Sequence, residues 1–336
     1  MKTAFHFYGF VYTDGLCGNC RREQICATLG SVLKNKKIYF FLLTVTVFLL
    51  FIIFPKIAFN GALTGLKLWA LTILPGLFPA AAVSSCIMAF SHRYSEKKGI
   101  IYIYITLAGL VCGYPLGAIL ASEYCRHHKY KDTLCEMLMP FCNVSSPSFI
   151  INYIFLQLPQ TSGKFKILIC IYAPLFLCIL GTAFYYMYIH DKSPLPLHIS
   201  GMPDNRKNPR SCLSMADIID DAILNTAKNM IKLGGYIVIF SCISAYINVI
   251  PFKNDIVPAV ICGITEITNG IYMAGKINAD KKLITAFIIL INSFGGFSTI
   301  MQTMGMINGS GLSIRKYIYG KILCTFITGV FCIVIL

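Results

Sequence analysis

Two apolar stretches of this 336-residue chain are interrupted by short runs of amide and hydroxyl side chains beside helix-breaking residues. The first run is NVSSPS at 143–148, and the second is NSFGGFST at 292–299. Amides and hydroxyls both donate and accept hydrogen bonds, so such runs can bind a polar solute away from water. Alternatively, they only tie neighbouring helices together. The predicted solute-binding residues of the two runs are Asn143, Ser145, Ser146, Ser148, Asn292, Ser293, Ser298 and Thr299.

Electrostatics indicates which kind of solute these runs would bind. Helix N-termini at an interrupted segment attract a carboxylate or a phosphate. The formal net charge of +15 agrees with a vestibule that concentrates anions. Nucleic acid is not an expected partner, because the Lys and Arg residues occur in short links between apolar segments rather than along one face. We therefore expect a small anionic or polar heterocyclic solute.

Glu266 is the candidate for energetic coupling. It lies in the apolar segment 256–276, and we interpret it as the only acidic residue well inside such a segment. A carboxylate in that position is expensive enough to suggest a function, so Glu266 with Asn269 could hold a coupling proton or cation. The alternative is a protonated carboxyl group that hydrogen-bonds to a neighbouring helix.

The run GYPLGA at 113–118 combines small residues, an aromatic ring and a proline. Tyr114 either stacks on a planar solute ring or serves only as a packing aromatic. Glycine and proline loosen or interrupt helices, which makes this run and the two breaks candidate hinges. The predicted hinge residues are Gly113, Pro115, Gly117, Pro147, Gly295 and Gly296.

No pattern in the chain indicates an enzyme. A Walker loop, an HExxH pair and a GxSxG elbow are all missing from the sequence. Most of the fifteen cysteines lie in apolar segments, where they act as small hydrophobes. The Cys17-Gly-Asn-Cys20 motif has no second pair at zinc-finger spacing. We expect no enzymatic activity, no cofactor and no metal.

The composition determines what kind of scaffold positions these residues. The chain is 56% hydrophobic and 13% charged with a mean hydropathy of +0.69, whereas soluble domains carry about 25% charged residues. Several stretches approach the ~20 apolar residues that cross a bilayer, and no alternating pattern of a β-barrel is present. The expected fold is an all-α, polytopic helical bundle embedded in membrane lipid.

The apolar segments are interrupted in a regular order. A first crossing at 38–54 is followed by eight segments, near 61–90, 100–121, 134–157, 166–189, 216–250, 256–276, 282–307 and 316–336. Four of the eight carry proline or glycine near the middle, and we expect them to be kinked, unwound or re-entrant. These four breaks fall at 75–79, 140–147, 234–235 and 295–296.

Several patterns of the first half recur in the second half, 148 to 150 residues later: Val111-Cys112-Gly113 as Ile261-Cys262-Gly263, Asn143 as Asn292, and Gly181 as Gly329. Such self-similarity indicates an internal repeat. Four crossings per repeat would make the repeats parallel, whereas one re-entrant segment in each would make them inverted, which we favour. The predicted organisation is a polar basic N-terminal segment (1–37), a first transmembrane helix (38–54), repeat 1 (57–190), a polar linker (191–213) and repeat 2 (214–336).

Six motifs follow one another across residues 60–336: GLKLWALTILPGLFP (65–79), CGYPLGA (112–118), FCNVSSPSFI (141–150), GGYIVIFS (234–241), GITEITNGI (263–271) and NSFGGFST (292–299). Together they resemble the YlbJ-type sporulation integral membrane proteins, of the nucleoside-recognition or Gate-domain class. The resemblance implies that two Gate-like repeats form a solute path.

The same resemblance implies a role in endospore formation and a location in a bacterial cell membrane, specifically the outer forespore membrane. It implies dipicolinate as the cargo, passed toward the forespore. A carrier of nucleosides or other polar heterocycles is the alternative within transport. A non-transporting scaffold or receptor in sporulation is the alternative outside it, and the oligomeric state stays open.

Overall fold

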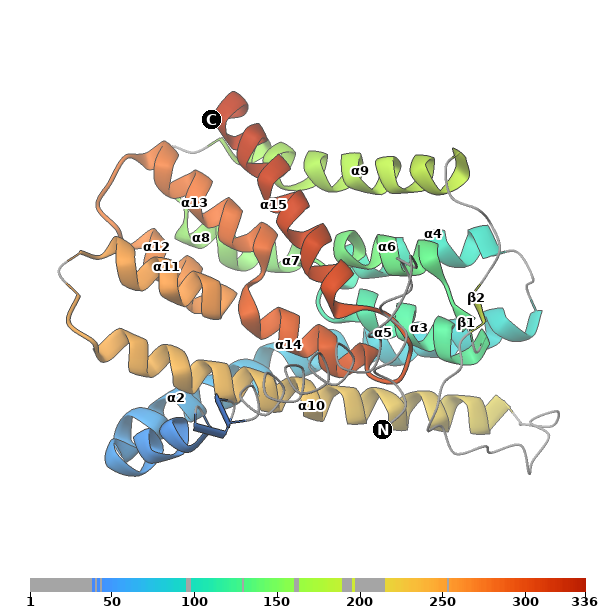
Figure 1. Cartoon of the computed structure of the whole chain (residues 1–336), viewed down its shortest axis with the longest axis horizontal. Coiled ribbons are helices and arrows are strands. Elements are labelled where there is room, and N and C mark those ends of the chain that lie inside the picture. Colours follow the sequence, from blue (N-terminus) through green and yellow to red (C-terminus); the bar gives the residue numbers. More distant parts are fainter. Residues whose placement is uncertain are drawn as a thin grey trace, which may run out of the picture. The chain divides into compact units, whose positions relative to one another are not determined.

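The computed structural model describes residues 38–39, 41–42, 44–94, 98–128, 130–159, 163–188, 195–196, 215–252 and 254–336 (Figure 1). The chain divides into two compact units, Met1–Pro55 and Lys56–Leu336. In the first unit, residues 44–53 form an apolar helix within the crossing predicted at 38–54. The predicted polar segment 1–37 and most of the linker 191–213 lie outside the described residues.

The second unit is almost entirely helical. A single two-residue antiparallel pair, β1 (Tyr130–Lys131) with β2 (Leu195–Pro196), is present in the described chain. The helices are α2 (Pro55–Leu68, beginning at the unit boundary), a π-helical turn (Trp69–Ile73), α3 (Leu74–Tyr94), α4 (Lys98–Cys112), α5 (Leu116–His128), α6 (Thr133–Cys142), α7 (Pro147–Phe149), a second π-helical turn (Ile150–Ile154), α8 (Phe155–Gln157), α9 (Lys164–Tyr188), α10 (Met215–Val249), α11 (Ile256–Thr265), α12 (Ile267–Gly275), α13 (Lys281–Phe294), α14 (Gly296–Ile307) and α15 (Ile314–Ile335).

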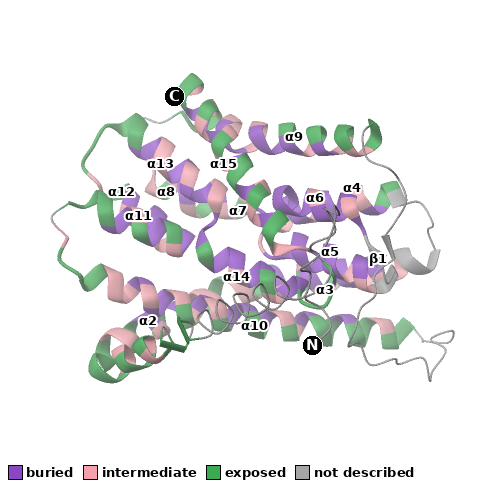
Figure 2. Cartoon of the chain, in the orientation of Figure 1, coloured by how far each residue is buried: buried purple, intermediate pink, exposed green. Residues whose placement is uncertain are grey.

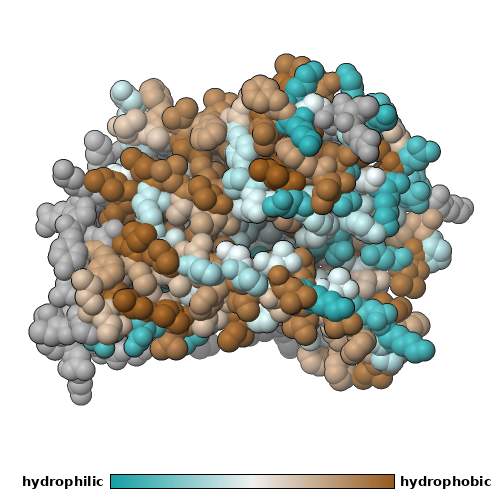
Figure 3. Space-filling model, turned by 180° about the vertical axis from the view of Figure 1, so that it is seen from behind, coloured by the Kyte–Doolittle hydropathy of each residue, from teal (hydrophilic) through white to brown (hydrophobic). Residues whose placement is uncertain are grey.

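Six helical stretches of the described chain are long and apolar enough to cross a membrane: 55–90, 133–157, 164–188, 215–249, 281–307 and 314–335. Large apolar side chains are exposed on their outer faces, and hydrophobic residues cover much of the surface seen in Figure 3. Lipid can cover such faces, because a helix satisfies its own backbone hydrogen bonds. The prediction of a polytopic all-α membrane protein is confirmed.

The two halves of the second unit contain the same elements in the same order. Each has a long helix, a helical hairpin, an interrupted helix and a final long helix. The contacts between helices correspond as well. Helix α6 contacts α9 of its own half and α15 of the other half, and α13 contacts α15 of its own half and α9 of the other half. Each half has three long stretches. An odd number of crossings per repeat gives the two repeats opposite orientations in the membrane, so this number agrees with inverted repeats. The assignment of these halves as Gate-like repeats stays a prediction.

Two of the eight predicted apolar segments, 100–121 and 256–276, fold as helical hairpins, although re-entrance is expected only of the four segments with a break. Helices α4 and α5 reverse at Gly113–Pro115, and α11 and α12 reverse at Glu266. A Cβ atom at Gly270 would overlap the backbone of Gly263, so the arms of the second hairpin touch backbone to backbone. Each arm is too short to cross a bilayer alone at about 1.5 Å per residue.

At two of the four predicted breaks, 75–79 and 234–235, the helix is neither unwound nor re-entrant, and a kink there stays a prediction. Helix α10 runs unbroken through Gly234-Gly235. The glycine at 234 instead makes room for a neighbouring ring. A Cβ atom there would lie 2.7 Å from Trp69 Cε2, and Trp69 Nε1 donates a hydrogen bond to Met230 O at 3.0 Å. Helix α3 also continues through Pro79, directly after the π-helical turn that ends at Ile73.

Buried apolar residues fill the space between the hairpins and the interrupted helices. Figure 2 shows buried residues along α5, α6 and α14, which lie in the interior of the second unit. The largest core cluster draws on α3, α5, α6, α10 and α14, whereas a second cluster joins α9, α12 and α13. The interrupted helices therefore belong to the core and have little lipid-facing surface.

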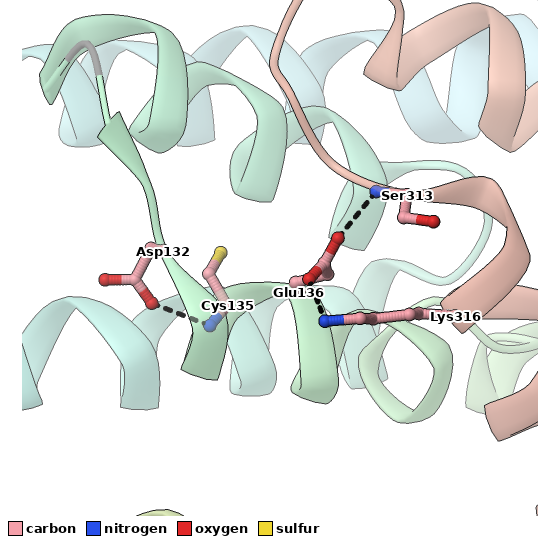
Figure 4. A network of polar contacts seen from close by, with 5 residues as sticks. All are labelled: Asp132, Cys135, Glu136, Ser313 and Lys316. Atoms are coloured by element: carbon pink, nitrogen blue, oxygen red, sulfur yellow. Dashed lines mark hydrogen bonds and ion pairs between the residues drawn. The ribbon is translucent and has the colours of Figure 1, made fainter. Parts of the chain in front are cut away.

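A buried carboxylate joins the two halves (Figure 4). The side chain of Glu136, on α6, is 0% exposed, and one of its oxygens lies 2.7 Å from Lys316 Nζ on α15. Its other oxygen accepts a hydrogen bond from the backbone N–H of Ser313 at 2.8 Å. Nearby, Asp132 caps the start of α6 by accepting a hydrogen bond from the Cys135 backbone N–H at 2.9 Å.

Glu136 is a buried acidic residue that the sequence pattern does not single out, because it lies at the start of an apolar segment and not well inside it. Glu136 lies in the stretch 133–157 and is completely buried. Its ion-pair partner is 180 positions further along the chain, so no local pattern announces the pair. The pair fixes the start of α15 against α6.

We predict that Gly270→Ala lowers the unfolding temperature of the purified protein in detergent. The added methyl group must force the arms of the second hairpin apart, and overpacking of this kind costs about 1–3 kcal/mol. Gly181→Ala on α9 is the matched control, because a Cβ atom there meets nothing within 4 Å. Equal unfolding temperatures for the two variants would contradict the hairpin contact.

We also predict an order of stability for variants of the ion pair. Lys316→Gln removes a positive charge from beside a fully buried carboxylate, whereas Glu136→Gln leaves a half-exposed ammonium that water can solvate, so the first is the more destabilising. The double variant should recover part of the loss. Thermal unfolding in a double-mutant cycle measures the coupling, and strictly additive effects would show that the pair does not stabilise the fold.

Candidate solute site

The first break lies between α6 and α7. Helix α6 ends at Cys142, and residues 143–146 are not helical. Pro147 has no backbone N–H and holds Ser146 in an extended conformation, so the helix cannot run through. Ser146 then starts α7 by accepting a hydrogen bond from the Phe149 N–H at 3.2 Å. The break predicted at 140–147 is confirmed.

The second break lies between α13 and α14. Gly295 and Gly296 have φ angles of +83° and +76°, a left-handed backbone that residues with a Cβ atom rarely adopt. The Thr299 hydroxyl donates to the carbonyl oxygen of Gly295 at 2.8 Å, which satisfies an acceptor freed by the break. The break predicted at 295–296 is confirmed.

Each hairpin turn supports the break of its own half. A Cβ atom at Gly113 would lie 2.6 Å from the Ser146 nitrogen, and one at Gly117 would lie 2.6 Å from the Cys142 oxygen. In the second half, a Cβ atom at Gly296 would lie 3.1 Å from the Ile264 oxygen. All six predicted hinge residues therefore lie at a break or at the first hairpin turn. That they act as hinges stays a prediction.

Asn143 connects the first break to the second half. Its side chain is fully buried, and Nδ2 donates to the Thr303 hydroxyl at 2.8 Å and to the Tyr317 hydroxyl at 3.3 Å. Tyr114 also reaches across, since a Cβ atom at Gly295 would lie 2.6 Å from its hydroxyl. Sequence reasoning missed Thr303 and Tyr317, although Thr303 follows Thr299 by one helical turn and shares its face.

The two polar runs meet at a small cavity. It encloses about 10 Å³ and is lined by Ser145, Asn292 and Ser293 together with apolar residues of both halves. That volume holds about one water molecule. Ser145 and Asn292, predicted from separate breaks, thus face the same space. Ser293 also shares a hydrogen bond with the Thr328 hydroxyl at 3.2 Å.

Several polar atoms in this region are buried without a hydrogen-bond partner in the described chain. They are the hydroxyls of Tyr114 and Ser145 and the Oδ1 atoms of Asn143 and Asn292. An unpaired buried polar atom costs about 1–3 kcal/mol, so native structures contain few of them. Four around the crossing of two broken helices indicate unused capacity to bind a polar molecule.

The remaining predicted binding residues lie apart from this cluster or use their polar groups locally. Ser148 is exposed and accepts a hydrogen bond from Asn152 at 3.1 Å. Ser298 is buried and accepts one from Gln302 at 2.9 Å. Ser146 and Thr299 serve the helix ends described above. A solute-binding role for these residues stays a prediction.

Glu266 has a structural function in the second hairpin. Its two carboxylate oxygens accept hydrogen bonds from the backbone N–H groups of Thr268 and Asn269, at 3.0 and 2.8 Å. It therefore caps the N-terminus of α12, where a negative charge is favourable. Asn269 contributes its backbone to this cap. A coupling role for Glu266 and Asn269 stays a prediction.

The comparisons with known proteins agree with the resemblance seen in the motifs. No protein-family model matches the sequence, and no solved structure matches it. The chain is 21% identical to the sporulation integral membrane protein YlbJ of Bacillus subtilis (strain 168). The alignment is 338 positions long and covers 85% of this chain and 78% of that protein. This polytopic helical membrane protein is therefore similar, at 21% identity over most of its length, to a sporulation integral membrane protein.

Proposed function

We propose that this chain is a membrane carrier for a small organic anion and acts in endospore formation, with dipicolinate as the first solute to test. The sporulation role is supported by the similarity to a sporulation integral membrane protein. The transport role is supported by one observation above all others. Two interrupted helices, one from each half, bring unpaired buried polar atoms together inside an apolar bundle.

Interrupted helices of this kind are suited to carrying a solute. Irregular backbone at membrane depth is tolerated only where protein buries it or where it lines a cavity. In transporters, such breaks occur at corresponding positions of two repeats, and the solute binds between them. The breaks after Cys142 and Phe294 occupy these positions, because each lies in the third segment of its half.

Entry of a solute requires the breaks to separate. The cavity of about 10 Å³ between Ser145 and Asn292 is far too small for a pyridine dicarboxylate. Backbone rotation at Gly113, Gly295 and Gly296 would allow this separation, because glycine has no Cβ atom to restrict φ. Movement of one half against the other around this site would give alternating access.

We predict that purified protein in liposomes carries labelled dipicolinate and that Asn292→Ala reduces the flux about tenfold, the effect of one lost hydrogen bond of about 1.4 kcal/mol. Asn292 is the informative position because its Oδ1 atom has no hydrogen-bond partner in the described chain. Removing that atom therefore breaks no hydrogen bond of the fold. Asn225→Ala, at an exposed amide on α10, is the matched control.

A labelled nucleoside is followed in parallel in the same liposomes. Movement of the nucleoside without dipicolinate would replace the anion by a polar heterocycle. Absence of both fluxes, with folded protein verified by its unfolding transition, would contradict transport and favour a scaffold. A scaffold should also tolerate Asn143→Ala together with Asn292→Ala.

A separate prediction concerns coupling. Under the coupling hypothesis, Glu266→Gln abolishes the dependence of flux on a pH gradient while leaving α12 capped, because the glutamine oxygen still accepts a backbone hydrogen bond. Asp255→Asn is the control, since Asp255 is exposed and its side chain makes no capping bond. An unchanged response of Glu266→Gln to the gradient would restrict this residue to its capping role.

A further inference from the structure

Lys321 is a basic residue in the interior of the bundle. It is 1% exposed and belongs to the largest fully buried side chains of the described chain. It follows the start of α15 by seven residues, about 10 Å along the helix axis. Lysines near helix ends usually extend their ammonium group to the water interface, whereas this one is enclosed by protein.

The protein does not neutralise this ammonium with a carboxylate. Within the described part of the chain, no acidic side chain forms an ion pair with Lys321, and the ion pair on this helix belongs to Lys316. Nζ instead lies 5.0 Å from the centre of the Tyr114 ring. A cation–π contact contributes about 0.5–2 kcal/mol, which is less than the several kcal/mol that removing an ion from water costs.

The packing of α15 places Lys321 beside the candidate solute site. A Cβ atom at Gly320 would lie 2.5 Å from Pro140 Cγ, so α15 crosses α6 closely just before the first break. Tyr317 lies one helical turn before Lys321 on the same face, and its hydroxyl contacts Asn143. Lys321 therefore shares its surroundings with the unpaired hydroxyl of Tyr114 and the unpaired Oδ1 of Asn143.

This positive charge is present in one half only. At the repeat offset of 148 residues, the position on α9 that corresponds to Lys321 is Ala173. The packing of α9 and α15 therefore does not itself require a lysine. A carboxylate group of a solute would supply the counter-charge that the chain leaves out, and the hydroxyl of Tyr114 could donate a second hydrogen bond to it.

We propose that Lys321 is the cationic group that binds a carboxylate of the transported solute, with Tyr114 as its neighbouring donor. This assignment rests on the proposed function, since it places the solute at the crossing of the two breaks. It explains why the site would select a carboxylate over a neutral molecule of the same shape. It also requires the breaks to separate, because Lys321 is covered in the conformation seen here.

The test compares Lys321→Met with the wild-type protein. Methionine has a similar length and no charge. Lys282→Met, at an exposed lysine near the start of α13, is the matched control for the loss of one positive charge. Unfolding temperatures are measured in detergent with sodium pyridine-2,6-dicarboxylate, with the neutral pyridine-2,6-dicarboxamide, and with a nucleoside, all at equal ionic strength. Dicarboxylate flux is measured on the same variants in liposomes.

We expect the dicarboxylate, but not the dicarboxamide, to stabilise the wild-type protein and the Lys282→Met control. Lys321→Met should require at least tenfold more dicarboxylate for the same stabilisation and should lose dicarboxylate flux. Without any solute it should unfold at the wild-type temperature or above, because it removes an unpaired buried charge.

Four results would overturn the assignment. Undiminished dicarboxylate binding and flux in Lys321→Met would overturn it while leaving the proposed carrier function intact. A clearly lower unfolding temperature of the solute-free variant would make Lys321 a structural residue. Stabilisation by the nucleoside alone, equal in wild type and variant, would overturn both the lysine assignment and the choice of an anion. Absence of stabilisation and of flux for every solute would instead reject the carrier function itself, and the assignment with it.

Discussion

The structure of the second unit depends on how the backbone is satisfied where its two interrupted helices end inside an apolar bundle. A helix that stops in this environment frees N–H and C=O groups, and lipid cannot replace their partners. Each half meets the requirement in the same way. A hairpin turn packs backbone to backbone against the break, through Gly113 and Gly117 in one half and Gly296 in the other. Serine and threonine hydroxyls then satisfy helix ends locally.

Charges inside the bundle follow a related rule. Glu136 is matched by Lys316 and by a backbone N–H, and Glu266 is matched by two backbone N–H groups of α12. Both acids therefore stabilise the fold. Lys321 differs from them, because its ammonium faces an aromatic ring and no acid of the described chain. Four of the seven unpaired buried polar atoms of the described chain occur in the same region as this charge, where the two breaks cross, and the other three belong to Tyr172, Thr226 and Ser244.

The distribution of paired and unpaired polar groups supports the proposed binding of a solute between the two breaks. Hydroxyl groups at the helix ends are paired locally, whereas Asn143, Asn292 and Tyr114, in the first hairpin turn, each keep an unpaired buried atom. The enclosed space between the breaks holds about one water molecule, so the conformation seen here is closed around the site. Under the proposed carrier function, a movement of one half against the other would open this site toward either side.

The amino-acid sequence by itself determined the membrane class, the positions of two real breaks and most of the polar residues that meet there. These features are local: hydropathy, the missing N–H of Pro147 and the left-handed backbone of Gly295 act within a few residues. Only the tertiary structure decided that Gly234 receives the Trp69 ring rather than breaking α10, and that 100–121 and 256–276 fold into hairpins. It also decided the burial of Glu136 and Lys321. The physical reason is that burial and pairing depend on groups far apart in the chain, and no local pattern encodes which of them will meet.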